Sequence, residues 1–271
     1  MPRPGFVLDV DKSTPPTLFW HGEGFRLEKL PADRSRVVYA PEPHEAIDDV
    51  DGAIRTALLD PIDMDPLPSL LFPGMKLTIA FDDVSLPLPK MRRPDLRQRI
   101  IEQVLTMAAD AGVDDVHIIA ALALHRRMHE FERRHAPGDR VYDAFDPRGL
   151  LYQHDAEEPD NLACLGTTDL GEEIEINKRA AESDLLVYVN INLVAMDGGW
   201  KSTAVGLASY RSLRHHHNPT TMEASHSFMD QHASELHKST WRMGKVMRDS
   251  GPKVFQIETT LNTDTFPQPF E

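Results

Sequence analysis

The chain is organised around a short apolar run, DLLVYVNINL at residues 184–193, and the turn that follows it, DGGWKS at residues 197–202. The run is rich in β-branched and aromatic side chains and is too short for a membrane-spanning helix. It therefore predicts a strand that is buried on both faces of a parallel sheet. Gly198 and Gly199 allow a tight turn and a close approach of the backbone to a ligand. Lys201 stands at the end of this turn.

The turn does not match the loop that binds nucleoside triphosphates. That loop needs a glycine directly before the lysine and another glycine six residues before it. Trp200 and Ala195 occupy these positions. Lys201 is therefore either a solvated lysine after a turn or a lysine held beside the sheet for other chemistry.

Composition excludes several classes of protein. The chain has 271 residues, enough for one large or two small domains, and a net charge of −14 from 43 acidic and 29 basic residues. Such a charge disfavours general nucleic-acid binding and anionic membrane surfaces. Cys164 is the only cysteine, which excludes a disulfide framework and favours a reducing compartment. The amino terminus lacks the apolar stretch of a signal peptide, and no run approaches the roughly 18 apolar residues of a membrane span. We expect a cytoplasmic protein.

Hydrophobic periodicity predicts an α/β fold. We expect an open, mixed, mostly parallel sheet flanked by helices over residues 43–271, after a small β-rich segment over residues 1–42. The predicted strands are 18–20, 25–27, 37–39, 77–81, 116–122, 150–152, 174–176, 184–193 and 254–257. The predicted helices are 47–58, 94–112, 127–134, 178–183 and a long last helix that starts at Thr220 and ends before Gly251.

Polar groups follow three of these strands. Asp83 and Ser85 follow the strand at 77–81, His125 and Arg126 follow the strand at 116–122, and the Lys201 turn follows the run at 184–193. In open parallel sheets, ligands bind beyond the carboxyl ends of the strands. The convergence favours a functional role for Lys201.

These stretches together resemble the lactate racemase family. Gly198 to Ser202 match its glycine-glycine-x-lysine-serine turn. In the family a nickel-binding histidine follows the lysine at a fixed spacing in sequence, and the same spacing from Lys201 leads to His217. The segments 83–89 and 123–126 stand where the family has an aspartate-x-threonine-arginine-proline-x-proline turn and a glycine-x-histidine-arginine turn. The resemblance covers roughly residues 43–260.

The resemblance implies a nickel-pincer nucleotide of the pyridinium-3,5-bisthiocarboxylic acid mononucleotide type. Lys201 would tether this cofactor covalently, and His217 would bind nickel, for which a neutral imidazole is a suitable ligand. His125 would act as a general acid/base, a role that suits a side chain with a near-neutral pKa. The remaining candidates for cofactor contacts are Asp83, Ser85, Gly198 and Gly199.

The sequence departs from the family at two positions. Leu86 replaces the arginine that binds the substrate carboxylate, so Arg92, Arg93 and Arg126 become the candidates for substrate binding. The family's second catalytic histidine has no counterpart, and Asn190 and Asn192 are the polar side chains in that segment. Asparagine can orient a hydroxyl group but does not exchange a proton near pH 7.

The family's catalytic domain is followed by a second α/β domain that closes over the site. Because the chain ends at Glu271, we expect residues 43–271 to be the amino-terminal catalytic domain alone. The first hypothesis is a racemase or epimerase of a 2-hydroxy acid or a related hydroxy compound. The second is a non-catalytic relative that binds a nucleotide or a partner. The third, ranked last, is a metal-dependent hydrolase using His215, His216 and His217.

Overall fold

The computed structural model describes residues 7–21, 24–39, 44–83 and 91–261. It divides the chain into two compact units, Met1–Glu45 and Ala46–Glu271. In the first unit, β1 (Val7–Asp9) pairs antiparallel with β4 (Arg36–Val38), and β2 (Thr17–His21) pairs antiparallel with β3 (Gly24–Glu28). Val10 is the one buried apolar residue among those described in this unit, so its strands enclose almost no core.

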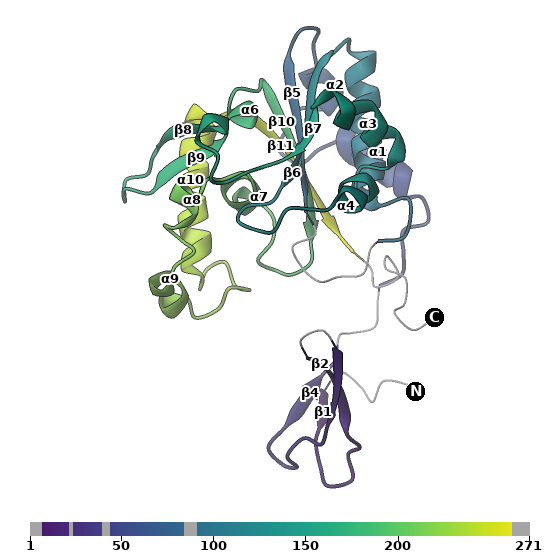
Figure 1. The fold of residues 1–271 in the computed structure, drawn as a ribbon, viewed down its shortest axis with the longest axis vertical. Coiled ribbons are helices and arrows are strands. Elements are labelled where there is room, and N and C mark those ends of the chain that lie inside the picture. The colour runs from purple at the N-terminus through teal and green to yellow at the C-terminus, as the bar shows by residue number, and fades with distance from the viewer. Residues whose placement is uncertain (1–6, 22–23, 40–43, 84–90, 262–271) are drawn as a thin grey trace. The chain divides into compact units, whose positions relative to one another are not determined.

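A five-stranded parallel sheet forms the centre of the second unit (Figure 1). Its order is β11 (Lys253–Thr260), β10 (Leu185–Asn192), β5 (Lys76–Asp82), β6 (Asp115–Ala121) and β7 (Leu151–Gln153). Every neighbouring pair in it is parallel. The predicted mostly parallel α/β fold is confirmed. The antiparallel pair β8 (Leu162–Thr167) and β9 (Glu173–Asn177) forms a separate hairpin outside this sheet.

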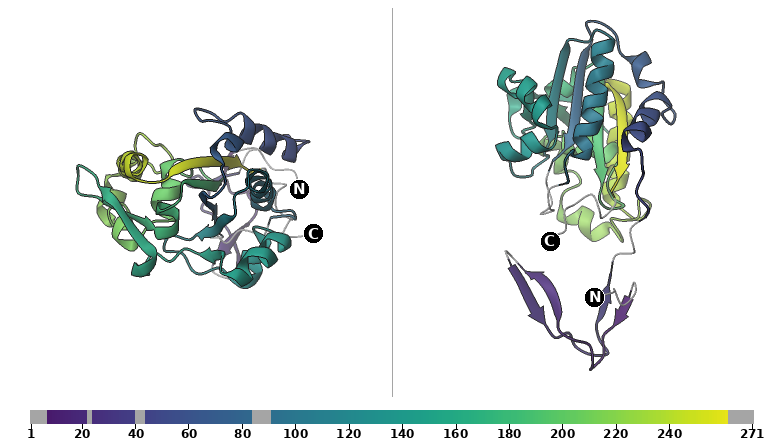
Figure 2. Two further views of the ribbon diagram at one scale, coloured as in Figure 1. Left: turned by 90° about the horizontal axis from the view of Figure 1, so that it is seen from above. Right: turned by 90° about the vertical axis from the view of Figure 1, so that its right-hand side faces the viewer.

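Alternating side chains of the central strands fill two cores, one on each face of the sheet. Leu77, Ile79 and Phe81 of β5 belong to the first core, and Ala80 belongs to the second. The first core is covered by α1 (Val50–Leu59), α2 (Leu67–Leu70), α3 (Leu96–Asp110) and α5 (Asp139–Phe145). The short α4 (Glu130–His135) precedes α5 and buries no residue of its own. The second is covered by α6 (Lys178–Ala181), α7 (Trp200–Gly206) and α10 (Glu235–Ser250), as Figure 2 shows. Burial on both faces explains why β10 is almost continuously apolar.

The prediction of one continuous last helix is wrong. The segment forms α9 (Pro219–Ala224) and α10, and the short α8 (Tyr210–Leu213) precedes both. Each of the two later helices has its own cap, because the Asn218 side chain accepts from Thr221 N and the Ser234 side chain accepts from His237 N. Between them, Ser227 and Asp230 accept hydrogen bonds from nearby backbone N–H groups, which favours turns over helix.

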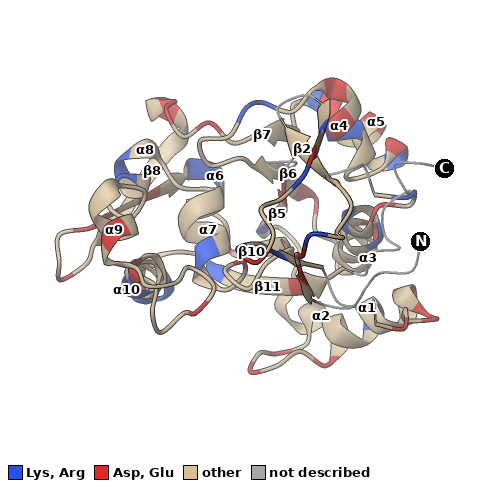
Figure 3. Cartoon of the chain, turned by 90° about the horizontal axis from the view of Figure 1, so that it is seen from below, with Lys and Arg blue, Asp and Glu red and all other residues tan. Residues whose placement is uncertain are grey.

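The strand order places a topological switch point between β5 and β10. From β5 the chain continues through α3 to β6 on one side, whereas β10 lies on the other side of β5. Open α/β sheets bind ligands in the crevice outside such a point. Asp83 directly follows β5, and the turn that carries Lys201 follows β10. Figure 3 shows the sheet end-on, with α7 next to β10 and with acidic and basic segments interspersed over the helices.

Candidate active site

The turn between β10 and α7 requires glycine. Gly198 has φ +91° and Gly199 has φ +59°, both in the left-handed region that other residues rarely adopt. A Cβ atom on Gly198 would also lie 2.6 Å from Glu258 Oε2 and 2.9 Å from Asn192 Oδ1. The two glycines therefore bring the backbone against the end of β11 and start α7 directly afterwards.

Lys201 is held by an acidic partner within the same turn. Its Nζ lies 2.7 Å from Asp197 Oδ1, and both side chains are largely buried, with exposed fractions of 17% and 18%. The other oxygen, Asp197 Oδ2, accepts from the backbone N–H groups of Leu193 at 3.0 Å and Val194 at 3.2 Å. Asp197 thus fixes the loop after β10 and the lysine together.

Glu258 on β11 supports the glycine turn from the neighbouring strand. Its Oε1 accepts from Gly199 N at 2.7 Å, and its Oε2 accepts from Asn190 Nδ2 at 2.7 Å and from Asn192 Nδ2 at 2.9 Å. The Asn190 side-chain oxygen accepts from the hydroxyl group of Ser202 at 2.9 Å. Asn190 and Asn192, the predicted catalytic asparagines, therefore contact the residues that support the Lys201 turn, and their side chains are hydrogen-bonded within the protein.

His125 lies at the end of β6 and faces the end of β5. Its Nδ1 is 3.0 Å from Asp83 Oδ2, and 47% of its side chain is exposed. A carboxylate only accepts hydrogen bonds, so Nδ1 carries the proton and Nε2 carries a free lone pair. The bond to Asp83 raises the pKa of His125 above its ordinary value. Arg97 supports this end of β5, because it donates to the carbonyl groups of Asp82 at 2.7 Å and Asp83 at 3.2 Å.

The backbone before His125 adopts a rare conformation. Ala123 has φ +51°, in the region that favours glycine, and it is the second residue of the turn that His125 closes. The turn is closed by a hydrogen bond from His125 N to Leu122 O at 2.8 Å. An outlier of this kind next to a half-exposed histidine is typical of a functional turn.

His217 is exposed, but the protein around it still lowers its pKa. Burial is the largest cause, and the charges of Lys201 and His125 act in the same direction. Lys201 likewise acts to lower the pKa of His125. The structure thus brings His125, Lys201 and His217 within electrostatic reach of one another.

His216 orients the His217 ring. The two Nδ1 atoms are 2.7 Å apart, so one nitrogen donates and the other accepts. His216 is buried, and burial lowers its pKa to about 3, so it stays neutral. His215 lies apart from this pair, with its Nε2 3.7 Å from Glu173 Oε2.

The arginines predicted to bind substrate are placed differently from one another. Arg126 makes a two-pronged ion pair with Glu132, at 2.8 and 2.7 Å, which lowers the pKa of Glu132 to about 2. Arg93 pairs with Asp139 at 2.6 Å. Arg92 is exposed and has no ion pair within the described part of the chain. Ser85 and Leu86 lie outside the described residues.

Comparison with protein-family models shows which family the chain belongs to. The model of the lactate racemase N-terminal domain matches residues 21–230, more than half of the chain. The chain belongs to this family. It is 26% identical over 168 residues to a lactate racemase of Thermoanaerobacterium thermosaccharolyticum, covering 60% of this chain and 37% of that protein. A lactate racemase of Lactiplantibacillus plantarum is 26% identical over 170 residues, covering 61% and 38%. The matched segments thus cover well under half the length of these relatives.

Solved structures agree with the fold of the family. The lactate racemase apoprotein of T. thermosaccharolyticum superposes with a TM-score of 0.63 at 20% identity, over 93% of this chain and 58% of that one. A protein of Thermotoga maritima superposes with a TM-score of 0.57 at 17% identity, over 78% and 50%. At these identities the likeness establishes the fold and nothing more.

Two acidic residues of the site were missed by sequence reasoning. Asp82 accepts from Tyr188 Oη at 3.0 Å and from Ile191 N at 2.6 Å, and burial raises its pKa to about 6. Glu258 is the other. Both contact β10 from neighbouring strands that are distant in sequence. A strand pattern does not reveal such neighbours, although the position of Asp82 at the end of a predicted strand was a usable signal.

Two further findings concern a histidine metal centre and membrane-spanning helices. Within the described residues, no three or more histidine, cysteine, aspartate or glutamate side chains are grouped to hold a metal ion, so His215, His216 and His217 do not form a hydrolase centre there. No helix in the same residues is both long and apolar enough to cross a membrane.

Proposed function

We propose that this chain is the cofactor-binding part of a racemase or epimerase that acts on a small 2-hydroxy acid or a related hydroxy compound. The observation that carries the proposal is that His125, bonded to Asp83 after β5, and Lys201, which follows β10, flank the switch point of the sheet, while the charges of both act on the pKa of His217. Family membership supports it, since two relatives are lactate racemases. We further propose that residues 43–271 are the amino-terminal catalytic domain, with residues 1–42 as a separate segment, and that the protein is cytoplasmic.

The residues of the site fit a nickel-pincer nucleotide. Lys201 is the side chain that would be joined to it, and Asp197, 2.7 Å away, is placed to accept the proton that an ammonium group loses before it acts as a nucleophile. His217 would bind nickel through Nε2, because its Nδ1 is engaged with His216. The lowered pKa of His217 keeps the ring neutral, the form that binds metals. When bound, the group supplies an acceptor for the hydride of the substrate carbon.

His125 performs the proton transfer in this proposal. Its free Nε2 takes the proton of the substrate hydroxyl group, and Asp83 stabilises the imidazolium that forms. For the reaction to balance, that proton must return to the oxygen and a hydride must return to the substrate carbon. Asn190 can orient a hydroxyl group but does not act as an acid or a base near pH 7. The described part of the chain therefore supplies one acid/base histidine, and a reaction on both faces of the substrate needs a second group.

The test is the intact mass of the chain after co-expression with the enzymes that synthesise the cofactor. We expect a covalent adduct that maps to Lys201 and about one equivalent of nickel. The matched control is Lys201→Arg, which keeps the positive charge but is no nucleophile, and it should carry neither. An unmodified chain without nickel would contradict the proposal.

A second candidate function is a non-catalytic relative that binds a nucleotide or a partner. The engagement of Arg93 and Arg126 with carboxylates, and of Asn190 with Glu258 and Ser202, favours it. It predicts nucleotide binding without conversion of any chiral hydroxy acid, measured by chiral chromatography.

A further inference from the structure

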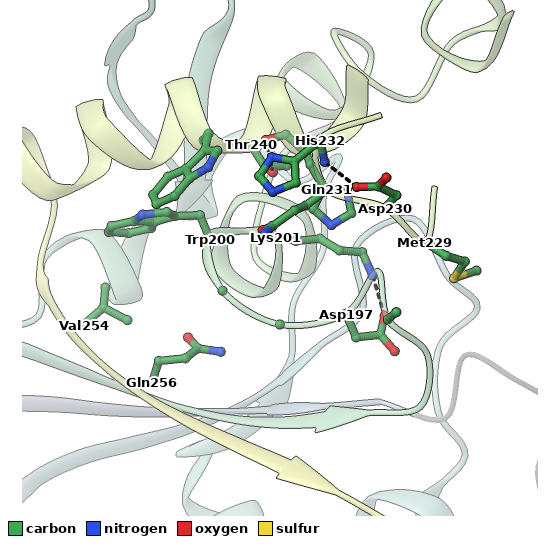
Figure 4. Close-up of a pocket in the computed structure, with 15 residues that line it drawn as sticks. Asp197, Trp200, Lys201, Met229, Asp230, Gln231, His232, Thr240, Val254 and Gln256 are labelled. Atoms are coloured by element: carbon green, nitrogen blue, oxygen red, sulfur yellow. Dashed lines mark hydrogen bonds and ion pairs between the residues drawn. The ribbon is translucent and has the colours of Figure 1, made fainter. Parts of the chain in front are cut away.

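A pocket of about 790 Å³ opens on the α10 side of the Lys201 turn. Figure 4 shows Trp200 and Lys201 on one side of it, with Val254 and Gln256 of β11 across from them. Its volume falls in the range of roughly 300–1,000 Å³ that is typical of pockets for drug-sized ligands. This space is larger than a three-carbon acid alone would fill.

The wall of this pocket is mainly aromatic and apolar. Trp200, Trp241, Met229 and Val254 contribute to it, and 59% of Trp241 and 52% of Met229 are exposed. Aromatic rings that pair edge to face or with an offset stabilise each other beyond the area that they bury. The wall therefore offers uncovered aromatic surface directly beside the residue that we propose to hold the cofactor.

The charges on the wall disfavour a second acid group in the ligand. Lys201 is already paired with Asp197, and Asp230 adds another carboxylate. His237 adds no positive charge, because burial and then Lys201 lower its pKa. The charges on the wall therefore do not attract an anionic side chain.

We infer that this pocket binds the side chain of the substrate and that this side chain is aromatic. The inference rests on the proposed function, because it takes the molecule to be a 2-hydroxy acid. The substrate is then an aryl-substituted 2-hydroxy acid rather than lactate or a dicarboxylic hydroxy acid. Its reacting end lies toward Lys201, and its ring lies against the tryptophans.

The test is calorimetric titration of the full chain, without cofactor, with 3-phenyllactate, lactate and malate. We expect phenyllactate to bind at least about tenfold more tightly than lactate, and malate no more tightly than lactate. Trp241→Ala should reduce the ratio to less than about threefold. The matched control is Trp20→Ala, an equally exposed tryptophan of the first unit, which should leave the ratio unchanged. A ratio below tenfold, a ratio that survives Trp241→Ala, or tightest binding of malate overturns the inference.

The same experiment separates this inference from the proposed function. Binding to the cofactor-free chain does not depend on a Lys201 adduct. If phenyllactate binds as expected but no adduct forms, the pocket is a binding site and the racemase proposal fails. If the adduct forms but phenyllactate is not preferred, the racemase proposal stands and the aromatic substrate is excluded.

Discussion

His217 is the residue on which the nickel proposal depends. Its ring is exposed, kept neutral by its surroundings and fixed through Nδ1 by His216, whereas His215 lies toward Glu173. We therefore expect nickel retention to fall most in His217→Ala, less in His216→Ala and least in His215→Ala. Residues that orient a metal ligand typically change metal affinity by roughly 10- to 100-fold. The measurement is nickel per chain after gel filtration of cofactor-loaded protein. Equal losses in all three variants would show that His217 is not the ligand.

Asp83 sets the basicity of His125. The hydrogen bond between them raises the pKa of His125, so the imidazolium is favoured in the folded protein. Asp83→Asn removes the negative charge at nearly constant shape, and the pKa of His125 should fall. In a loaded enzyme the base must be neutral, so the rise of activity with pH should move to lower pH in this variant.

Titration of the His125 ring by NMR measures this change directly, without any cofactor. Asp155→Asn is the matched control, because Asp155 is a carboxylate that pairs with Arg127 nearby in sequence. The control should leave the titration of His125 where it is. An unchanged pKa in Asp83→Asn would mean that the hydrogen bond contributes nothing in solution.

At the scale of elements, the β10–α7 turn is supported from β11. In Glu258→Gln, the single side-chain oxygen can accept hydrogen bonds from the two asparagines. The NH₂ group of the glutamine would then face the N–H of Gly199, and two donors cannot form a hydrogen bond. Hydrogen bonds to charged groups contribute roughly 1.5–3 kcal/mol, so amide exchange at Gly199 should accelerate roughly tenfold or more.

Amide exchange followed by NMR tests this, with the amides of α3 as an internal reference for global stability. Glu182→Gln, at an exposed glutamate after α6, is the matched control. Acceleration at Gly199 with α3 unchanged would assign Glu258 the role of holding the turn. Equal acceleration everywhere would reduce it to a contribution to overall stability.

The elements also show what periodicity can predict. Continuous apolar runs such as 184–193 and 77–81 predicted β10 and β5, because strands buried on both faces need them. The caps at Asn218 and Ser234 were not predicted, since side-chain hydrogen bonds decided where the last helices begin. The parallel class of the sheet was predictable from alternating strands and helices. The neighbours of β10 were not, because pairing across more than 60 residues leaves no local pattern.

At the scale of the whole molecule, the same non-local pairing creates the support of the candidate site. His125 and Lys201 stood out in sequence because their types and turns are distinctive. Asp82 and Glu258 did not, because an acidic residue at a strand end is ordinary until the fold places it against another strand. Pairing of β5 with β10 brings Asp82 under Tyr188 and Ile191, and it therefore couples the protonation of the site to folding.

That coupling predicts how stability depends on pH. Burial raises the pKa of Asp82 from 3.8 to about 6 in the folded state, so folding favours the protonated acid. The resulting stabilisation is present in full below pH 3.8 and is lost as the pH rises through 6. The difference between the two pKa values corresponds to roughly 3 kcal/mol at most.

The variant Asp82→Asn cannot ionise at this position and can still hydrogen-bond Tyr188 and Ile191. From pH 4 to pH 8, the wild type should therefore lose roughly 2–3 kcal/mol of its free energy of unfolding relative to this variant. Urea denaturation of both proteins at the two pH values measures the difference, with Asp110→Asn, an exposed carboxylate at the end of α3, as the control. A difference that does not change with pH would show that Asp82 ionises as readily in the folded chain as in the unfolded one.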